Sequence, residues 1–327
     1  MPITFDLNLL ASLHGTKVYL ETGMYNPEDP TVSLNQAMVC EALQKVYSIE
    51  LRTDWVNNAL KKYKKEIEEH RLRVIEDDSN NLLAHIKGNG DFTRDKTLFY
   101  LDAHVDGAWE QSGRPFVNRC PVFNELRAIQ QLPRKDHVIC VDDVRILKNP
   151  SPWFEESFGK VNFIEEIKSQ ILTINPEYQF VYLDGVIPGD VLCAFVWDDE
   201  LQHNYDMHGM YDSYTPDVLR MVGKIDEAVE YDCNHLEEGN WTKLQELYLA
   251  YSEGGQRAKI LKYALEWPVT AEDNEWAAWR AFDELSVLGY YHNNFYAAKR
   301  AYERLREINR YPLSQQQRIE NNAMFFR

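Results

Sequence analysis

The chain has 327 residues, 44% of them hydrophobic and 27% charged, a length that allows two domains and a sizeable core. Its 35 basic and 52 acidic residues give a net charge of −17, which argues against nucleic acid and anionic membranes as partners, because both are bound through cationic surfaces. Five scattered cysteines without a Cys-x-x-Cys pair predict a reducing, cytoplasmic location, and no apolar run approaches the length of a membrane span.

Strand and helix patterns alternate along residues 5–173. Five short apolar runs predict strands, and they span residues 17–21, 45–49, 71–75, 97–101 and 137–141. Helices are predicted before, between and after them, at residues 5–13, 33–44, 54–69, 122–131 and 163–173. Continuous apolar strands that alternate with helices are typical of a parallel sheet buried on both faces. The sequence therefore predicts five parallel β/α units.

A change of pattern follows these units. Residues 179–183 and 191–196 also predict strands, but only residues 184–190 lie between them. That connection is too short for a crossover helix, so the two strands must form an antiparallel hairpin. A terminal antiparallel pair argues against a plain dinucleotide-binding sheet, whose strands are all parallel.

The C-terminal part predicts helices. We place an α/β domain at residues 1–200, a polar linker at 201–215 and a helical domain at 216–327. Residues 241–268 and 279–312 each predict two helices around a glycine-containing turn and resemble the tetratricopeptide pattern. Two such units are fewer than a free-standing solenoid needs. We therefore expect this region to pack on the first domain, on a second copy of the chain or on a protein partner.

Polar residues follow each of the first three strands. Gly23, two residues after Glu21, allows a loop to approach a ligand closely. Glu50 is placed to accept hydrogen bonds from a ribose diol, and Asp78 and Ser79 are placed to bind the exocyclic amine of adenine. Ligands of open α/β sheets bind at these strand ends. Without a G-x-G-x-x-G motif for pyrophosphate, the pattern favours a nucleoside-bearing cofactor that has no phosphates, although any one of these residues alone could be a plain loop residue.

These motifs resemble the class I S-adenosylmethionine-dependent methyltransferases. Residues 17–197 contain Val-Tyr-Leu-Glu-Thr-Gly, Val-Tyr-Ser-Ile-Glu and Leu-Phe-Tyr-Leu-Asp-Ala-His in order, and a terminal hairpin distinguishes that fold. The chain departs from the family at residues 24–30, where a second glycine is usual. The resemblance implies a Rossmann-like fold with S-adenosylmethionine as cofactor. It implies the following cofactor-binding residues: Glu21, Gly23, Glu50, Asp78, Ser79 and Asp102.

Acidic residues also follow the fourth and fifth strands. Asp102-x-His104 and the pair Asp142-Asp143 resemble the metal site of magnesium-dependent sugar O-methyltransferases. The resemblance implies that Asp102, Asp142 and Asp143 bind Mg²⁺, and that Asp102 and His104 are catalytic. His104 would take the proton from a sugar hydroxyl, at a position where the family usually has aspartate. Hard oxygen ligands suit Mg²⁺, and histidine titrates near the working pH. We expect methyl transfer to a hydroxyl of a small-molecule or glycan acceptor.

Three alternatives stay open at this stage. Asp143 could cap a turn and pair with Arg145 instead of binding a metal. The segment Asp102-Ala-His-Val-Asp106 matches the D-A-H-x-D motif of manganese ureohydrolases such as arginase, but the other two motifs of that family are missing. The chain could also be an interaction protein that has lost methyltransferase activity and recruits a partner through its helical tail.

Overall fold

The computed structural model describes residues 3–103, 120–148, 163–211, 214–251, 256–269, 275–291 and 293–326. The chain divides into two compact units, Met1–Gly223 and Lys224–Arg327. Among the described residues, no helix combines the length and the apolar character needed to cross a membrane. The five cysteines are all free and buried.

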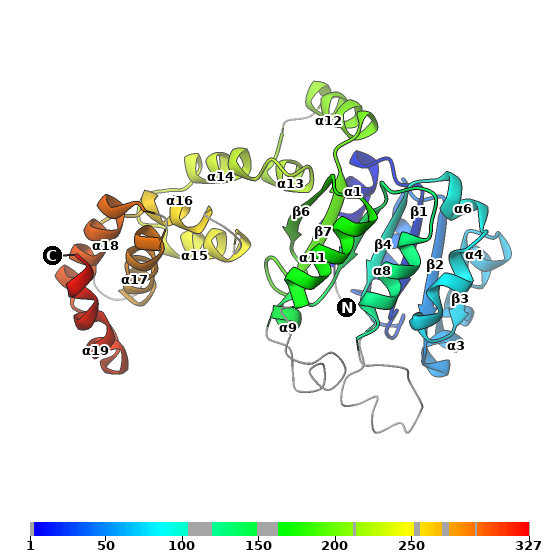
Figure 1. Ribbon diagram of the computed structural model, residues 1–327, viewed down its shortest axis with the longest axis horizontal. Coiled ribbons are helices and arrows are strands. Elements are labelled where there is room, and N and C mark those ends of the chain that lie inside the picture. Colours follow the sequence, from blue (N-terminus) through cyan, green and yellow to red (C-terminus); the bar gives the residue numbers. More distant parts are fainter. Residues whose placement is uncertain are drawn as a thin grey trace. The chain divides into compact units, whose positions relative to one another are not determined.

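The first unit is built on one seven-stranded sheet (Figure 1). The strands are β1 (Val18–Thr22), β2 (Lys45–Glu50), β3 (Leu72–Glu76), β4 (Thr97–Leu101), β5 (Val138–Val141), β6 (Tyr178–Leu183) and β7 (Val191–Val196). Their order is β3-β2-β1-β4-β5-β7-β6, in which the first five strands are parallel and β7 runs antiparallel to both β5 and β6. The predicted fold class, a Rossmann-like sheet of five parallel β/α units with a terminal antiparallel hairpin, is confirmed.

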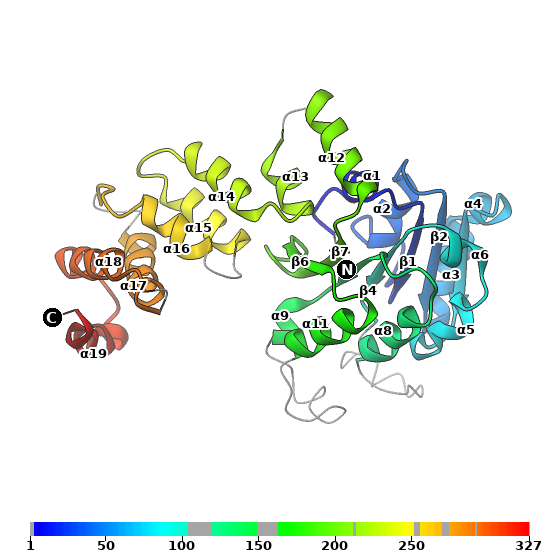
Figure 2. The ribbon, with the colours of Figure 1, turned by 45° about the horizontal axis from the view of Figure 1, so that its top comes forward.

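Helices surround this sheet. They are α1 (Leu7–Leu13), α2 (Ser33–Val39), α3 (Thr53–Lys62), α4 (Lys64–Glu68), η1 (Ser79–Asn81), α5 (Leu82–Ile86), α6 (Gly90–Arg94), α8 (Val122–Gln130), α9 (Val144–Lys148), α11 (Phe163–Ile174), α12 (Asp199–Tyr211) and α13 (Pro216–Met221). Helices α5, α8 and α11 share one apolar core with side chains of β1, β4, β5 and β7, and α8 and α11 lie side by side (Figures 1 and 2). Helix α2 contacts β1 and β2, and its buried side chains lie outside that core.

Burial explains why the strands were recognisable. Every residue of β1, β4, β5 and β7 is buried, because these strands lie in the middle of the sheet, whereas β3 at one edge is partly exposed. A strand that is covered on both faces has no solvent-exposed side, so its apolar residues do not alternate with polar ones. The continuous apolar runs in the sequence follow from this position.

The boundary of the first unit differs from the sequence prediction. Most of the predicted linker forms α12, whose Leu201 and Tyr205 are buried, and the Asn204 side chain donates to backbone carbonyl groups at the end of α1. Helix α13 also belongs to this unit, because Arg220 forms an ion pair with Asp184 of the hairpin loop at 2.8 Å. The unit therefore extends to Gly223.

The second unit consists of helices. They are α14 (Ile225–Asn234), α15 (Trp241–Ala250), α16 (Gln256–Tyr263), α17 (Glu275–Tyr291), α18 (Phe295–Ile308), α19 (Leu313–Asn321) and η2 (Asn322–Phe325). Helices α17 and α18 pack closely, since a Cβ at Gly289 would lie 3.0 Å from Ala298. The two predicted helix pairs, α15 with α16 and α17 with α18, are present, but Gly289 lies inside α17 and not in the turn that precedes α18. Their membership of the tetratricopeptide class stays a prediction.

Candidate functional site

The end of β1 lies directly against the end of β4. The amide of Asp102 donates to the Thr22 carbonyl oxygen at 3.1 Å. Gly23 has a φ of +79°, in the left-handed region that favours glycine, and a Cβ there would lie 2.4 Å from the Asp102 carbonyl oxygen. Glycine is therefore required at this turn both by the backbone conformation and by the lack of space.

Glu21 is fully buried below this turn, on the side of the sheet where α2 lies. Its carboxylate accepts hydrogen bonds from the hydroxyl groups of Ser33 at 2.5 Å, Ser48 at 2.7 Å and Tyr19 at 3.1 Å. Burial raises the pKa of Glu21, and the bonds from Ser33 and Ser48 act against that rise. The sequence predicts a cofactor contact for Glu21. That contact stays a prediction. In the structure Glu21 ties β1 to β2 and α2 and so fixes the turn.

Glu50 lies at the end of β2 and is 5% exposed. Its carboxylate accepts hydrogen bonds from the backbone amides of Tyr25 at 3.1 Å and Arg52 at 2.8 Å. Burial raises the pKa of Glu50 to about 7, and these backbone bonds oppose the rise. Tyr25 has a φ of +65° and packs on Trp55 with 4.6 Å between the ring centroids. Glu50 therefore anchors the loop after β1 at the same sheet edge as Gly23.

The end of β3 is tied to α8. Asp78 caps η1 by accepting from the amide of Asn80 at 2.9 Å, and the next residue, Ser79, is buried. The side chain of Asn124 on α8 donates to the side-chain oxygen of Asn80 at 2.5 Å. The neighbouring Glu125 turns inward and is buried. Sequence reasoning missed Glu125, because a glutamate in the first turn of a helix is ordinarily a solvent-exposed residue.

Acidic side chains gather at the end of β5. Asp142 accepts a hydrogen bond from the Tyr100 hydroxyl at 2.7 Å through one oxygen and from the Asp143 amide at 2.7 Å through the other. Burial and the adjacent charge of Asp143 raise the pKa of Asp142. Asp143 has a φ of +62°, a strained conformation of the kind that gathers at functional sites.

Asp190 joins this pair from another part of the chain. One ligand oxygen each from Asp142, Asp143 and Asp190 lies within 4.8 Å of the others, and all three residues are buried. Asp190 precedes β7, which runs antiparallel to β5, so the start of β7 and the end of β5 meet at the same sheet edge. The predicted hairpin contained the signal that could have identified Asp190.

A guanidinium group lies within the acidic cluster. Arg145 forms ion pairs with Asp143 at 2.6 Å and with Asp190. The Asp143–Arg145 pair considered from the sequence is therefore present. Three carboxylates against one guanidinium leave the cluster with a formal charge of −2 when all the acids are ionised.

Asp102 lines the same small cavity as Asp142 and Asp143. It does not belong to the acidic cluster of Asp142, Asp143 and Asp190, whose ligand oxygens lie within 4.8 Å of one another. Its role as a metal ligand, catalytic residue and cofactor contact stays a prediction. His104, predicted as the base, and Asp106 of the ureohydrolase-like motif lie outside the described residues.

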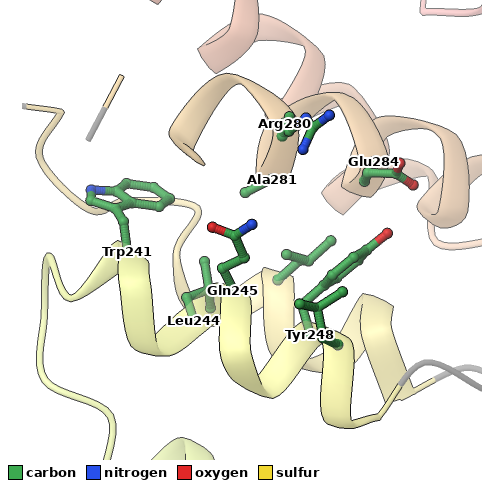
Figure 3. A pocket seen from close by; sticks show the side chains of 9 residues that line it. Trp241, Leu244, Gln245, Tyr248, Arg280, Ala281 and Glu284 are labelled. Atoms are coloured by element: carbon green, nitrogen blue, oxygen red, sulfur yellow. The ribbon is translucent and has the colours of Figure 1, made fainter. Parts of the chain in front are cut away.

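The second unit contains a separate cavity of about 290 Å³ between α15 and α17 (Figure 3). Gln245 points from α15 toward Ala281 of α17, and the Tyr248 ring points toward the part of α17 that carries Glu284. Burial raises the pKa of Tyr248, and the charge of Glu284 adds to this rise. The lining residues are Trp241, Leu244, Gln245, Tyr248, Leu249, Leu261, Arg280, Ala281 and Glu284. The cavity therefore combines an apolar wall with a few polar groups.

Comparisons with known proteins give only distant similarities. No protein-family model and no curated protein matches the chain. An O-methyltransferase from Bacillus cereus in complex with SAH is 16% identical, with a TM-score of 0.39 over 58% of this chain and 79% of its own. TomG from Streptomyces achromogenes, an O-methyltransferase of tomaymycin synthesis in complex with SAM, is 16% identical, with a TM-score of 0.38 over 59% of this chain and 78% of its own. Spermidine synthase from Thermotoga maritima is 12% identical, with a TM-score of 0.35 over 67% of this chain and 73% of its own.

Proposed function

We propose that the first unit binds S-adenosylmethionine and transfers its methyl group to a hydroxyl of a sugar, glycan or other small acceptor, assisted by a divalent cation. The observation that carries this proposal is the junction of the β1 and β4 ends. Gly23 and Asp102 touch there, and the carboxylate of Glu50 anchors the adjoining loop. A nucleoside cofactor without phosphates suits this edge, because the turn after β1 does not open a helix against a pyrophosphate.

Different residues of this edge would bind different parts of the cofactor. Glu50 would accept hydrogen bonds from the two ribose hydroxyl groups, as the acid at the end of β2. Asp78 and Ser79 would bind the polar edge of adenine at the end of β3. Gly23 lets the turn after β1 pack against the backbone of Asp102, and this contact would shape the cofactor site at the strand ends. When bound, S-adenosylmethionine supplies an electrophilic methyl group on a sulfonium centre.

The acidic cluster fits a hard divalent cation. Its donors are all carboxylate oxygens, and its formal charge of −2 matches the charge of Mg²⁺. Asp142, Asp143 and Asp190 would hold the cation, with Asp102 available in the same cavity. A bound cation would favour the deprotonated form of the acceptor hydroxyl. His104 remains the proposed base.

A transfer assay tests this function. The full chain is incubated with S-adenosylmethionine labelled on its methyl group and with separate acceptors, including sugar nucleotides, free glycosides and simple phenols. The proposal predicts labelled product from a hydroxyl acceptor with Mg²⁺ present and at least roughly tenfold less with EDTA. Transfer that is unaffected by EDTA would remove the cation from the mechanism, and transfer only to nitrogen acceptors would exclude O-methylation.

A second candidate function is the recruitment of a partner by the helical unit, with no catalysis in the first. The cavity between α15 and α17 favours it, because its apolar wall and polar rim are typical of a binding groove. Gln245→Trp fills this cavity, whereas Glu246→Trp adds the same ring at an exposed position outside the lining. A partner captured by the second variant and not by the first would support recruitment through the cavity.

A further inference from the structure

Arg145 brings a positive charge into the acidic cluster of Asp142, Asp143 and Asp190, and the proposed function assigns it no role. It lies at the start of α9, two residues after Asp143, whose backbone is strained. Nη1 of its guanidinium contacts Oδ1 of Asp143 at 2.6 Å and also contacts Oδ2 of Asp190. One nitrogen atom therefore contacts two of the three carboxylates at the same time.

A divalent cation in this cluster would need the same place. Mg²⁺ binds carboxylate oxygens at about 2.0–2.1 Å, so a cation that binds both Asp143 and Asp190 has to contact both carboxylates at once. Nη1 of Arg145 already occupies such a position. The guanidinium and the cation are alternatives there, because two positive charges so close together repel each other. With Arg145 in place the cluster still carries a formal charge of −2, so it continues to attract a divalent cation.

Two of the carboxylates are held in position without the guanidinium. Oδ1 of Asp190 accepts a hydrogen bond from the backbone amide of Arg145 at 2.9 Å. Asp142 accepts from the Tyr100 hydroxyl and from the Asp143 amide, both at 2.7 Å. These donors are backbone groups and a buried tyrosine, so the bonds persist when the Arg145 side chain moves. The set of cation ligands is therefore organised independently of the charge that partly neutralises it.

The Arg145 side chain is the member of the cluster that can move into water. It is 28% exposed, whereas the side chains of Asp143 and Asp190 are 3% and 0% exposed. A long arginine side chain keeps its charge hydrated when it turns outward, while the buried carboxylates stay where the fold places them. Buried acids need a positive counter-charge, and either a guanidinium or a metal cation can provide it.

We propose that Arg145 is a built-in competitor of the divalent cation, and that a cation binds Asp143 and Asp190 only by displacing the guanidinium into solvent. This inference rests on the proposed cation site. It predicts that Arg145 lowers the affinity of the wild-type chain for Mg²⁺. An ion pair that serves only the stability of the fold predicts no gain in affinity when Arg145 is replaced.

Calorimetric titration of MgCl₂ into the full chain tests this competition. Arg145→Gln removes the positive charge and keeps N–H donors for the carboxylates. Lys148→Gln is the matched control, because it removes a positive charge from the same helix at an exposed side chain that lies over the Tyr182 ring. We expect Arg145→Gln to bind Mg²⁺ at least about tenfold more tightly than the wild type, and the control to bind within about threefold of it. Equal affinity in the wild type and Arg145→Gln would overturn the competition.

Thermal unfolding of the same variants separates binding from stability. In EDTA, Arg145→Gln should melt below the wild type, because the buried carboxylates lose their counter-charge. Saturating Mg²⁺ should raise the melting temperature of Arg145→Gln by more than that of the wild type, since tighter binding to the folded state stabilises it more. Equal shifts in the two proteins would contradict the proposal and leave Arg145 a structural role alone.

A labelling experiment on the wild-type chain does not depend on the folding of a variant. Phenylglyoxal modifies accessible guanidinium groups, and mass spectrometry of peptides gives the rate at each arginine. Arg134 is the internal control, because its side chain is 30% exposed and pairs with Asp136 at 2.6 Å. Mg²⁺ should speed the modification of Arg145 and leave that of Arg134 unchanged, and an unchanged rate at Arg145 under saturating Mg²⁺ would overturn the displacement.

The outcomes also distinguish this inference from the proposed function. Mg²⁺ that binds the wild type and Arg145→Gln equally well would overturn the competition and leave the cation site intact. Mg²⁺ that binds neither protein would overturn the cation of the proposed function and this inference together.

Discussion

Gly23 and Asp102 touch so closely that a Cβ on the first would lie 2.4 Å from the carbonyl oxygen of the second. The contact joins the ends of β1 and β4, two neighbouring strands of the parallel sheet. It fixes the position of the loop that follows β1 and, through that loop, the surroundings of Glu50. The proposed cofactor site depends on this junction.

Gly23→Ala should therefore disrupt the site. Alanine would adopt a left-handed conformation and would also overlap the backbone of Asp102, so we expect a loss of stability and of S-adenosylhomocysteine binding. Gly88→Ala is the matched control, because Gly88 has a φ of +74° with nothing within 4 Å of a Cβ. The control should lose about 1–2 kcal/mol and keep binding. Equal losses of stability in urea unfolding for both variants would show that the overlap has no consequence.

The acidic cluster leads to a prediction about cation binding. Asp190→Asn removes one of three carboxylates, while Asp142 and Asp143 remain. Calorimetric titration should show Mg²⁺ affinity reduced by roughly tenfold or more. Asp199→Asn, which changes an exposed aspartate in the first turn of α12, should leave the affinity unchanged. If Asp190→Asn binds Mg²⁺ as the wild type does, Asp190 serves only as the partner of Arg145.

Buried histidines predict a loss of stability in acid. Burial lowers the pKa of His137 from 6.5 to about 3 and that of His14 to about 4. Below pH 6.5 the unfolded chain binds a proton at each position that the folded chain does not bind, so stability falls as the pH falls toward these values. Each histidine contributes about 1.4 kcal/mol per pH unit in that window.

The variant His137→Asn isolates one of these contributions. Asparagine keeps an acceptor for the Thr97 amide, which donates to Nδ1 of His137 at 3.1 Å. Between pH 7 and pH 5, urea unfolding should show the variant losing about 2 kcal/mol less than the wild type. The exposed His203→Asn serves as the control. Parallel pH profiles for wild type and His137→Asn would contradict the prediction.

The domain boundary predicts which fragment folds. A chain that ends at Gly223 keeps α12 and α13, whereas one that ends at residue 200 loses the burial of Leu201 and Tyr205 and the Arg220–Asp184 pair. Burying two such side chains stabilises a domain by a few kcal/mol. We expect cooperative thermal unfolding only for the longer fragment, or at a clearly higher temperature than for the shorter one. Identical unfolding curves would place the boundary at residue 200.

Much of the fold was predictable because the physical signals are local. Short apolar runs identified the buried strands, and the length of residues 184–190 required the hairpin. Helix α12 was missed because its sequence is mostly polar and only Leu201 and Tyr205, one turn apart, face the core. The predicted helix 54–69 divides into α3 and α4 at Tyr63, whose φ of −107° and ψ of 31° leave the helical region.

The site was predictable in part for the same reason. Gly23, Glu50, Asp78, Ser79, Asp102, Asp142 and Asp143 all lie at a strand end or within a few residues after one, and the structure places them along the same sheet edge. Asp190 lies at the start of the antiparallel strand β7, and Glu125 lies in the first turn of α8. The predicted hairpin could have identified Asp190, whereas the position of Glu125 follows from the packing of α8, which a single sequence does not encode in any short pattern. The role of Glu21 likewise depended on its three hydroxyl partners, two of which come from other elements.

Calorimetric titration of S-adenosylhomocysteine into the wild-type chain, Glu50→Gln and Glu177→Gln tests the central claim most directly. The account predicts saturable binding to the wild type and to the exposed control, and affinity weaker by about 10- to 100-fold in Glu50→Gln, because an amide N–H donor replaces one of the two carboxyl oxygens that would bind the ribose. Absence of binding to the wild type, or equal affinity in Glu50→Gln, would contradict a cofactor site at this edge of the sheet.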